Sequence, residues 1–409
     1  MGHWSRNKGL DLSMTCLGRP RLIVFALGIS EPGTMGGNSK IALEAARCLA
    51  SRMEVHFILP RHKLPTLTAS LGDVPELKVH AVDDYAKPDK THPFASVRHY
   101  TPLARSLFLS LKIDAKDVVF GISDFHVDVL PLYALQPEFG FRWLPSVFLF
   151  VPGLWENLRA GYGFPILKYA VYWIYQRWLF GKMKRRATAF VVTNEVDKIR
   201  FPSGFANRLF AYYGGVNVEQ IPVEPVAKKR DVVFCSRLHP QKGIDGFLDV
   251  WRIVRTACPA VRLTVIGNGD LAYEDYLKRK AMRLGISDSI EWLGYVNNEA
   301  KYEIYASSRV FVHPTVFDNN GMVAAEALCS GLPVVMFDLP ALRDVYATGC
   351  VKVPPGDKVA FAKEVARLLS EPSYYATVAP TPGQIAKLRD EWSWPHRAER
   401  FRVFLEALP

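Results

Sequence analysis

Residues 310–337 read VFVHPTVFDNNGMVAAEALCSGLPVVMF, and this stretch decides the fold class. A short apolar run over 310–313 leads into a polar loop that opens a helical pattern over 318–330, and a second apolar run follows over 333–337. Short apolar runs bounded by turn residues are typical of buried strands, and a helix between two of them is typical of a parallel sheet. The stretch therefore predicts a strand–helix–strand unit of an α/β protein.

The same alternation runs through the rest of the chain. In the second half we expect further strands at 231–235, 262–266 and 290–293, with helices at 246–257, 273–284 and 299–306. In the first half we expect strands at 21–28, 54–59, 117–122, 146–151 and 189–193, with a helix at 39–51. Two such series predict two doubly wound Rossmann-like domains facing an interdomain cleft. We divide the chain into an N-terminal domain at 1–213, a linker at 214–229, a C-terminal domain at 230–380 and a final helical segment at 381–409.

Composition and missing motifs exclude several classes of protein. The chain has 409 residues, 49% of them hydrophobic and 22% charged, which excludes a disordered or collagenous chain. There is no Walker A loop, no complete Gly-x-Gly-x-x-Gly and no Gly-x-Ser-x-Gly, which disfavours P-loop nucleotidases, dinucleotide dehydrogenases and α/β-hydrolases. The six cysteines form no Cys-x-x-Cys pair and no Asp-x-Asp occurs, so we expect no metal site and no cofactor.

Positive charge is concentrated in one aromatic segment. The chain carries 51 basic and 40 acidic residues, and residues 154–186 read LWENLRAGYGFPILKYAVYWIYQRWLFGKMKRR. An apolar, aromatic helix flanked by cations is typical of a membrane interface with anionic lipids, whereas a core helix with a basic cap is the alternative. Nucleic acid is disfavoured because no RNA-binding module signature occurs. The first twenty residues do not resemble a signal peptide and no run of 18 uncharged apolar residues exists, so we predict no membrane span.

Two cations follow the first strand of the second half. In 233–243, VFCSRLHPQKG, Arg237 comes directly after the strand and Lys242 stands five residues later beside Gly243. Both lie at the carboxyl end of the strand, where open α/β sheets bind ligands. Two converging cations suit a diphosphate, although two surface charges on a loop remain an alternative.

The loop and helix of the opening stretch carry two carboxylates. Asp318 precedes a turn of Asn319, Asn320 and Gly321, and Glu326 lies inside the helix that follows. Glycine allows the backbone to come close to a ligand, and free N–H groups at a helix start bind anions. Because the helix around Glu326 is otherwise apolar, that carboxylate needs a partner, which a pair of sugar hydroxyls would provide; a position facing solvent is the alternative.

Together these segments resemble the signature of glycosyltransferase family 4, whose members have the GT-B fold. In that family a strand leads to Gly/Ser-Arg-Leu and then Lys-Gly, as residues 236–238 and 242–243 do here. Later comes Pro-Ser-x-x-Glu-x-x-Gly-x-x-x-x-Glu-Ala and then Gly-x-Pro-Val, which residues 314–327 and 331–334 follow without a gap in spacing. The similarity covers nearly all of residues 210–405. It implies that a helix starting near Trp392 crosses back to the first domain.

The resemblance implies a role for each matching residue. Arg237 and Lys242 would neutralise the donor's diphosphate, Glu326 would bind the ribose hydroxyls, and Asp318 would hold hydroxyls of the donor sugar. Further donor contacts would come from the first-domain glycine loop and from the start of the second-domain helix, that is, from Gly36, Gly37, Asn320, Gly321, Met322 and Val323.

Two positions depart from the family pattern. The family usually has glutamate where Asp318 stands, and many members carry a histidine where Phe150 stands here. His126, in the segment SDFHVD, is an alternative catalytic group in the cleft, although an ordinary loop histidine would read the same. We therefore predict Asp318, Arg237, Lys242 and His126 as the catalytic residues.

The sequence thus predicts a metal-independent, retaining glycosyltransferase. It would move a sugar from a nucleoside diphosphate donor to a lipid-linked or other glycan acceptor at the cytoplasmic face of a membrane, where it would be peripheral. A catalytically weak GT-B-like subunit that binds a nucleotide or a partner enzyme is the alternative that Asp318 and Phe150 motivate. A GT-B epimerase or phosphorylase is a third, weaker alternative.

Overall fold

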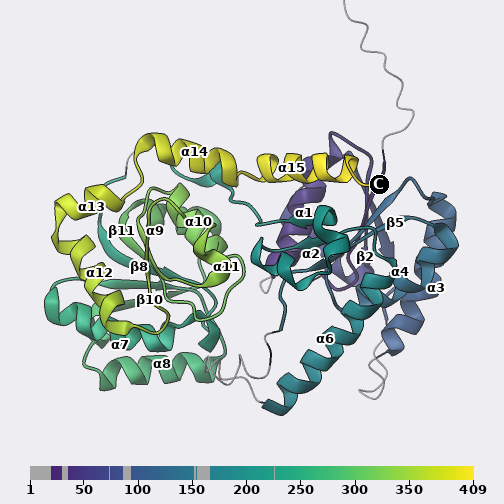
Figure 1. Cartoon of the computed structure of the whole chain (residues 1–409). Coiled ribbons are helices and arrows are strands. Elements are labelled where there is room, and N and C mark those ends of the chain that lie inside the picture. Colours follow the sequence, from purple (N-terminus) through teal and green to yellow (C-terminus); the bar gives the residue numbers. More distant parts are fainter. Residues whose placement is uncertain are drawn as a thin grey trace, which may run out of the picture.

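Two α/β domains lie side by side, each built on its own parallel sheet (Figure 1). The computed structural model describes residues 20–29, 36–72, 74–85, 94–151, 153, 166–224 and 226–409. In spatial order the N-terminal sheet consists of β3 (Leu77–Val82), β2 (Val55–Pro60), β1 (Leu22–Phe25), β4 (Val118–Gly121), β5 (Arg142–Val147), β6 (Phe190–Val192) and β7 (Leu209–Ala211). The C-terminal sheet consists of β10 (Ile290–Gly294), β9 (Leu263–Ile266), β8 (Arg230–Cys235), β11 (Ser308–His313), β12 (Val334–Phe337) and β13 (Cys350–Val353).

The strand order of both sheets predicts where a ligand crevice lies. Strand β1 pairs in parallel with β2 on one side, where Leu22 is opposite Val55, and with β4 on the other, where Leu22 is opposite Val118. The C-terminal sheet repeats this arrangement with β8 between β9 and β11. Open α/β sheets bind ligands beyond the carboxyl ends of the strands at the point where the order reverses. That point lies between β1 and β4 in one domain and between β8 and β11 in the other.

Helices cover both faces of each sheet. In the N-terminal domain these include α1 (Gly37–Ala50), α2 (Leu64–Leu71), α3 (Ala95–Leu111), α4 (His126–Phe139) and α6 (Ile166–Arg186). The rest of the chain forms α7 (Ile244–Ala257), α8 (Leu271–Arg283), α9 (Asn298–Ala306), α10 (Met322–Cys329), α11 (Pro340–Arg343), α12 (Lys358–Ser370), α13 (Pro372–Val378), α14 (Pro382–Trp392) and α15 (Trp394–Glu406).

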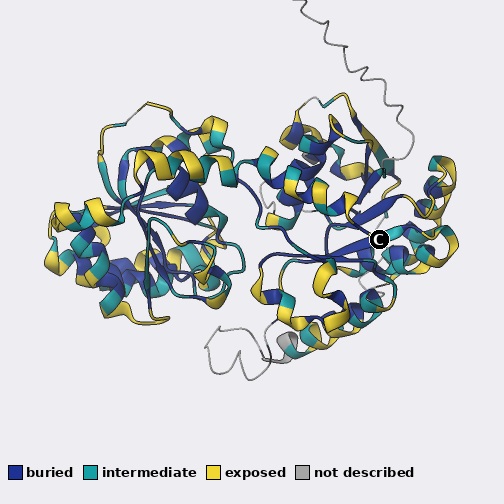
Figure 2. Ribbon diagram, turned by 45° about the horizontal axis from the view of Figure 1, so that its top comes forward, coloured by how far each residue is buried: buried dark blue, intermediate teal, exposed yellow. Residues whose placement is uncertain are grey.

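Burial explains why the strands read as continuous apolar runs. All four residues of β1 are fully buried, and alternate residues belong to different clusters. Leu22 and Val24 pack with α1, while Ile23 and Phe25 pack in the cluster that includes residues of α3 and α4. Figure 2 shows the strands of both sheets as buried and the outer faces of the helices as exposed. The predicted α/β fold with two doubly wound domains is confirmed.

The last helix returns to the N-terminal domain. Trp394, Phe401 and Leu405 of α15 are buried in the same cluster as α1, whereas α14 packs against α10 of the C-terminal domain. The chain therefore passes between the domains twice, and Figure 1 shows α14 and α15 in yellow along one edge of both. The two passages lie together, because the Val216 N–H donates to the Trp392 carbonyl over 2.7 Å.

Some predicted element bounds were wrong. We expected a strand over 146–151, but β5 ends at Val147 and the residues after it line a loop. Pro145 and Ser146 interrupt the apolar pattern of that strand, and the Ser146 hydroxyl is satisfied by donating to the Gly121 carbonyl over 2.7 Å. Strands β3, β7 and β13 were missed, since β3 is an edge strand with exposed polar residues and β7 has only three residues.

Candidate active site

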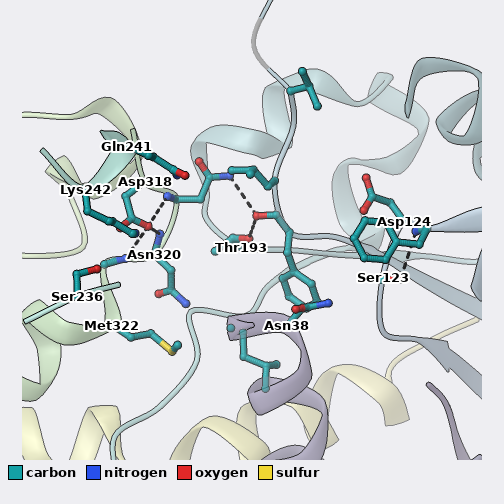
Figure 3. Close-up of a pocket in the computed structure, with 18 of the residues that line it drawn as sticks. Asn38, Ser123, Asp124, Thr193, Ser236, Gln241, Lys242, Asp318, Asn320 and Met322 are labelled. Carbon is teal, nitrogen blue, oxygen red and sulfur yellow. Dashed lines mark hydrogen bonds and ion pairs between the residues drawn. The ribbon is translucent and has the colours of Figure 1, made fainter. Parts of the chain in front are cut away.

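A pocket of about 500 Å³ lies between the two domains at the carboxyl ends of their strands (Figure 3). The C-terminal domain contributes Ser236, Gln241, Lys242, Asp318, Asn319, Asn320, Gly321, Met322 and Val323. The N-terminal domain contributes Gly37, Asn38, Ile41, Ser123, Asp124, Phe125, Phe148, Leu149, Val151, Tyr172, Gln176 and Thr193.

The loop after β8 positions Lys242. It forms a short 3-10 helix, η5 (Pro240–Lys242), and ends at Gly243, whose φ is +73°. A Cβ at Gly243 would lie 1.9 Å from the Pro314 carbonyl oxygen, so only glycine allows this loop to lie against the loop after β11. The close approach brings the Lys242 ammonium to 2.6 Å from the Asp318 carboxylate.

Asp318 is held from two sides. Its Oδ2 takes the ion pair with Lys242, and its Oδ1 accepts hydrogen bonds from the N–H groups of Asn319, Asn320 and Gly321 at 2.9–3.2 Å. Burial alone would raise the pKa of Asp318, but Lys242 and these donors outweigh it and hold the pKa well below its usual range. The carboxylate is therefore ionised and fixed at the pocket wall.

His313 lies beneath this carboxylate and was not predicted as a site residue. Its side chain is buried at the end of β11, with Nε2 3.7 Å from Asp318 Oδ2. Burial lowers its pKa to about 4, despite the opposing charge of Asp318, so the ring is neutral near pH 7. A Cβ at Gly321, whose φ is +60°, would lie 3.3 Å from this ring. The ring therefore packs under the turn that starts α10.

Glu326 has a partner in the protein itself. It is 4% exposed, and its carboxylate lies 2.9 Å from the Lys301 ammonium of α9. The position facing solvent that we kept as an alternative is therefore wrong. Glu326 also lies outside the pocket lining, so its predicted contact with ribose stays a prediction.

The remaining predicted residues divide between the lining and its surroundings. Gly37, Asn320, Gly321, Met322 and Val323 line the pocket. Gly36 is the N-cap of α1, directly before the lining residue Gly37. The roles predicted for these residues stay predictions.

Arg237 and His126 lie outside the lining of the pocket. Arg237 is exposed and makes no hydrogen bond or ion pair with another residue in the described part of the chain. His126 starts α4 and is half-buried against the rings of Phe94 and Tyr175, with centroids 6.0 and 6.1 Å away. Burial lowers its pKa. Its catalytic role is a prediction without a contact to the pocket.

Asp124 and Gln176, two polar residues of the N-terminal wall, were not predicted as site residues. Asp124 follows β4, and its Oδ2 accepts a 2.6 Å hydrogen bond from the amide of Gln176 on α6. The same amide donates to the Leu149 carbonyl over 2.7 Å and accepts from the Val151 N–H over 2.8 Å. Gln176 thus fastens α6, the loop after β5 and Asp124 together. Phe150 of that loop packs instead on Phe180, with ring centroids 5.4 Å apart.

Asn319 joins the two walls by direct hydrogen bonds. Asn319 donates to the Phe148 carbonyl over 3.2 Å and to Asp197 Oδ2 over 3.1 Å, and its carbonyl accepts from Asn194 over 3.1 Å. Burial raises the pKa of Asp197 to about 6, although Arg200 opposes this. The link lies next to Asp318, so contact between the domains and the geometry of the C-terminal wall are coupled.

Two further features bear on metals and membranes. Within the described ranges no group of three or more His, Cys, Asp or Glu residues is arranged to hold a metal ion. No described helix is both long and apolar enough to cross a bilayer. Part of the predicted membrane segment, residues 154–165, lies outside the described residues. The remainder forms α6, on which Val171, Tyr172, Ile174 and Trp178 are 44–62% exposed.

These features define a class, the two-domain GT-B fold with a ligand pocket between the domains. Sucrose-phosphate synthase from Thermosynechococcus elongatus superposes with a TM-score of 0.70, covering 94% of this chain and 97% of its own at 15% identity. Anabaena HepE, solved in complex with UDP-glucose, superposes with a TM-score of 0.70, covering 95% of this chain and 100% of its own at 15% identity. At such identities the likeness shows the fold alone.

The sequence similarity to a known family lies in the C-terminal domain. Residues 229–371 match the family model of glycosyl transferases group 1. An uncharacterised glycosyltransferase of Methanocaldococcus jannaschii is 31% identical over 142 residues, which are 34% of this chain and 36% of that protein. A phosphatidyl-myo-inositol mannosyltransferase of Mycobacterium leprae is 33% identical over 164 residues, 38% of this chain and 42% of that protein. Residues 229–371 are therefore similar to the group 1 glycosyl transferases, in agreement with the resemblance to family 4.

Proposed function

We propose that the protein transfers a sugar from a nucleoside diphosphate sugar to a hydroxyl group of an acceptor. The observation that carries the proposal is the fixed Lys242–Asp318 pair in the interdomain pocket, on the wall formed by the domain that matches the group 1 glycosyl transferases. In the reaction the bond between the sugar and the diphosphate breaks, the diphosphate leaves with the electron pair, and the acceptor oxygen bonds to the sugar as its proton is released.

The donor roles follow from charge. Lys242 neutralises the diphosphate as negative charge develops on it, and Arg237, exposed on the same loop, joins it when the donor binds. Asp318 accepts hydrogen bonds from hydroxyls of the donor sugar. The buried side-chain oxygen of Asn320 lies beside it and has no hydrogen-bond partner among the described residues. Protein cations take the place of a metal ion, and no cofactor is required. We propose that the anomeric configuration is retained, as the family 4 resemblance implies.

The nature of the donor is supported by relatives only in general terms. The Anabaena structure binds UDP-glucose and the Mycobacterium leprae relative is a mannosyltransferase, so donors with different sugars occur among similar proteins. The chain aligns with less than half the length of the sequence relatives. We therefore propose the nucleoside diphosphate sugar class without a particular base or sugar.

We propose a lipid-linked acceptor at the cytoplasmic face of a membrane. Helix α6 supports this, because its exposed apolar residues are followed by a basic end with Lys182, Lys184, Arg185 and Arg186. Such a helix binds in the interface of an anionic bilayer without crossing it. Tyr172 and Gln176 of the same helix line the pocket, so a lipid bound beside α6 would have its head group close to the donor.

The test is the release of nucleoside diphosphate from a panel of donors in EDTA, with and without membrane lipids. Lys242→Ala is expected to lower the rate by about 100- to 1000-fold, because it removes a charge that stabilises the transition state. Lys280→Ala is the matched control, since Lys280 of α8 pairs with Asp245 and Asp249 of α7 and does not line the pocket. An unchanged rate in Lys242→Ala would refute the proposal. Donor binding without turnover in the native protein would instead favour the non-catalytic subunit.

A further inference from the structure

The two walls of the pocket differ in charge. On the C-terminal wall a cation, Lys242, is paired with a carboxylate, Asp318. Among the described residues of the N-terminal wall, Asp124 is a carboxylate, and no lysine, arginine or histidine lines the pocket there. Figure 3 shows Ser123 and Asp124 across the pocket from Lys242 and Asp318. A second substrate bound on the N-terminal wall therefore meets one negative charge and no compensating cation.

Asp124 is held in place as a binding group. It lies in the loop three residues after the buried strand β4, and the 2.6 Å bond from the Gln176 amide fixes its carboxylate. Gln176 is itself held by hydrogen bonds to the backbone of Leu149 and Val151. Its amide group is therefore fixed in the orientation that donates to Asp124. A carboxylate accepts about four hydrogen bonds, so Asp124 retains capacity to accept from a ligand hydroxyl.

The surroundings of Asp124 are apolar and aromatic. Phe125, Leu149 and Tyr172 line the pocket and are 41–47% exposed, so their faces are accessible to a ligand. A pocket with apolar walls and a few fixed polar groups binds a ligand that has both apolar faces and polar edges. A sugar or cyclitol ring has C–H groups on its faces and hydroxyls around its rim, and it matches this wall.

We propose that Asp124, oriented by Gln176, binds the reacting hydroxyl of the acceptor, and that the acceptor presents there an uncharged polyhydroxylated ring. This inference rests on the proposed transferase function. A phosphate or carboxylate beside the reacting hydroxyl would face the Asp124 carboxylate at the pocket wall. Like charges placed opposite each other at such short range are strongly unfavourable. Burial raises the pKa of Asp124, and the hydrogen bond from Gln176 opposes this because it favours the ionised carboxylate.

The test uses the full chain with the donor that the EDTA panel identifies. Acceptor probes are offered in neutral and anionic pairs: glucose with glucose 6-phosphate, myo-inositol with inositol 1-phosphate, and a neutral glucosyl lipid with phosphatidylinositol in matched vesicles. We expect the native protein to use the neutral member of at least one pair with about 10-fold or higher kcat/KM. Asp124→Asn should lower acceptor kcat/KM by about 10- to 100-fold and reduce the preference for the neutral member.

Donor binding and thermal unfolding separate a lost acceptor contact from a folding defect. In Asp124→Asn the dissociation constant of the donor and the unfolding temperature should match those of the native protein, because the donor wall is unchanged. Gln176→Leu should show the same selective loss for the acceptor, to a smaller extent. Glu138→Gln is the matched control, since Glu138 is an exposed carboxylate on α4 that pairs with Arg105.

The outcomes are distinct. Preference for an anionic acceptor, transfer to water alone, or an unchanged acceptor kcat/KM in Asp124→Asn overturns this inference while leaving the transferase function standing. No donor discharge by the native protein refutes the proposed function, and the acceptor assignment falls with it.

Discussion

Breaking the buried Lys301–Glu326 pair should strongly destabilise the C-terminal domain, and the cost should depend on which of the two residues is replaced. The side chains are 11% and 5% exposed, and the two charges lie 2.9 Å apart. Removing one partner of such a pair leaves an uncompensated buried charge, which costs about 3–5 kcal/mol. By contrast, the Arg61–Asp83 pair is 60% and 71% exposed, and its loss should cost less than about 1 kcal/mol.

A second lysine makes the two substitutions unequal. Burial lowers the pKa of Lys40 on α1, and the charge of Glu326 opposes this while Lys301 adds to it. In Lys301→Met, Glu326 keeps Lys40 as a neighbouring cation, so the cost should fall near 3 kcal/mol. In Glu326→Gln both lysines lose the carboxylate that they share, so the cost should reach about 5 kcal/mol. The double variant should cost about 2 kcal/mol less than the sum of the single ones.

The assay is a double-mutant cycle measured by urea unfolding, with Arg61→Ala as the exposed control. Because a two-domain chain need not unfold in one step, each transition is followed separately and the cycle is taken on that of the C-terminal domain. A cost below 1 kcal/mol for both single variants, or costs that simply add, would refute the reasoning. It would mean that water solvates Glu326 and that the carboxylate is available to a ligand without its lysine.

Two further predictions concern backbone and protonation. Gly243→Ala places a Cβ 1.9 Å from the Pro314 carbonyl oxygen, so it should lower stability by more than about 3 kcal/mol and also lower donor turnover, because Lys242 moves with the loop. Gly246 lies inside α7, and a Cβ there would come no closer than 3.9 Å to the Lys358 side chain, so Gly246→Ala should stabilise by up to about 1 kcal/mol. Equal effects of the two substitutions in thermal unfolding would contradict this. The raised pKa of Asp197, about 6 against 3.8, means that the folded state binds this proton more tightly, so Asp197 contributes stability at pH 4 that is lost as pH rises through 6. Relative to Asp197→Asn, the native protein should therefore lose about 2–3 kcal/mol between pH 4 and 7, and parallel stability curves would contradict this.

The parts of the fold that the sequence predicts are those with local causes. Strands such as β1 and β8 are buried on both faces, so their apolar runs are visible without any partner. Strand β3 lies at the sheet edge and alternates with exposed residues such as Lys78, so its pattern resembles that of a loop. The start of β5 was missed because Pro145 breaks the run within a strand whose neighbours nevertheless hold it in the sheet.

The site residues also divide into those that a local sequence pattern predicts and those that only the packing of distant elements brings together. Lys242 and Asp318 each lie next to a strand end, so topology alone brings them to one edge, and their 2.6 Å pairing agrees with that expectation. Asp124 and Gln176 are 52 residues apart, and their bond depends on how α6 crosses the sheet, for which no local pattern exists. The same holds for the partner of Glu326: the apolar helix showed that a partner was needed, but Lys301 comes from another helix.

The return of α15 to the first domain has a consequence for synthesis on the ribosome. Trp394, Phe401 and Leu405 complete the core in which Leu22 and α1 are buried, so that core stays open until residue 405 has been made. The cluster of the C-terminal domain closes at almost the same point of synthesis, because it ends at Trp392. We therefore expect the two domains to complete their cores nearly together, and not in the usual order in which the N-terminal domain of a nascent chain folds first.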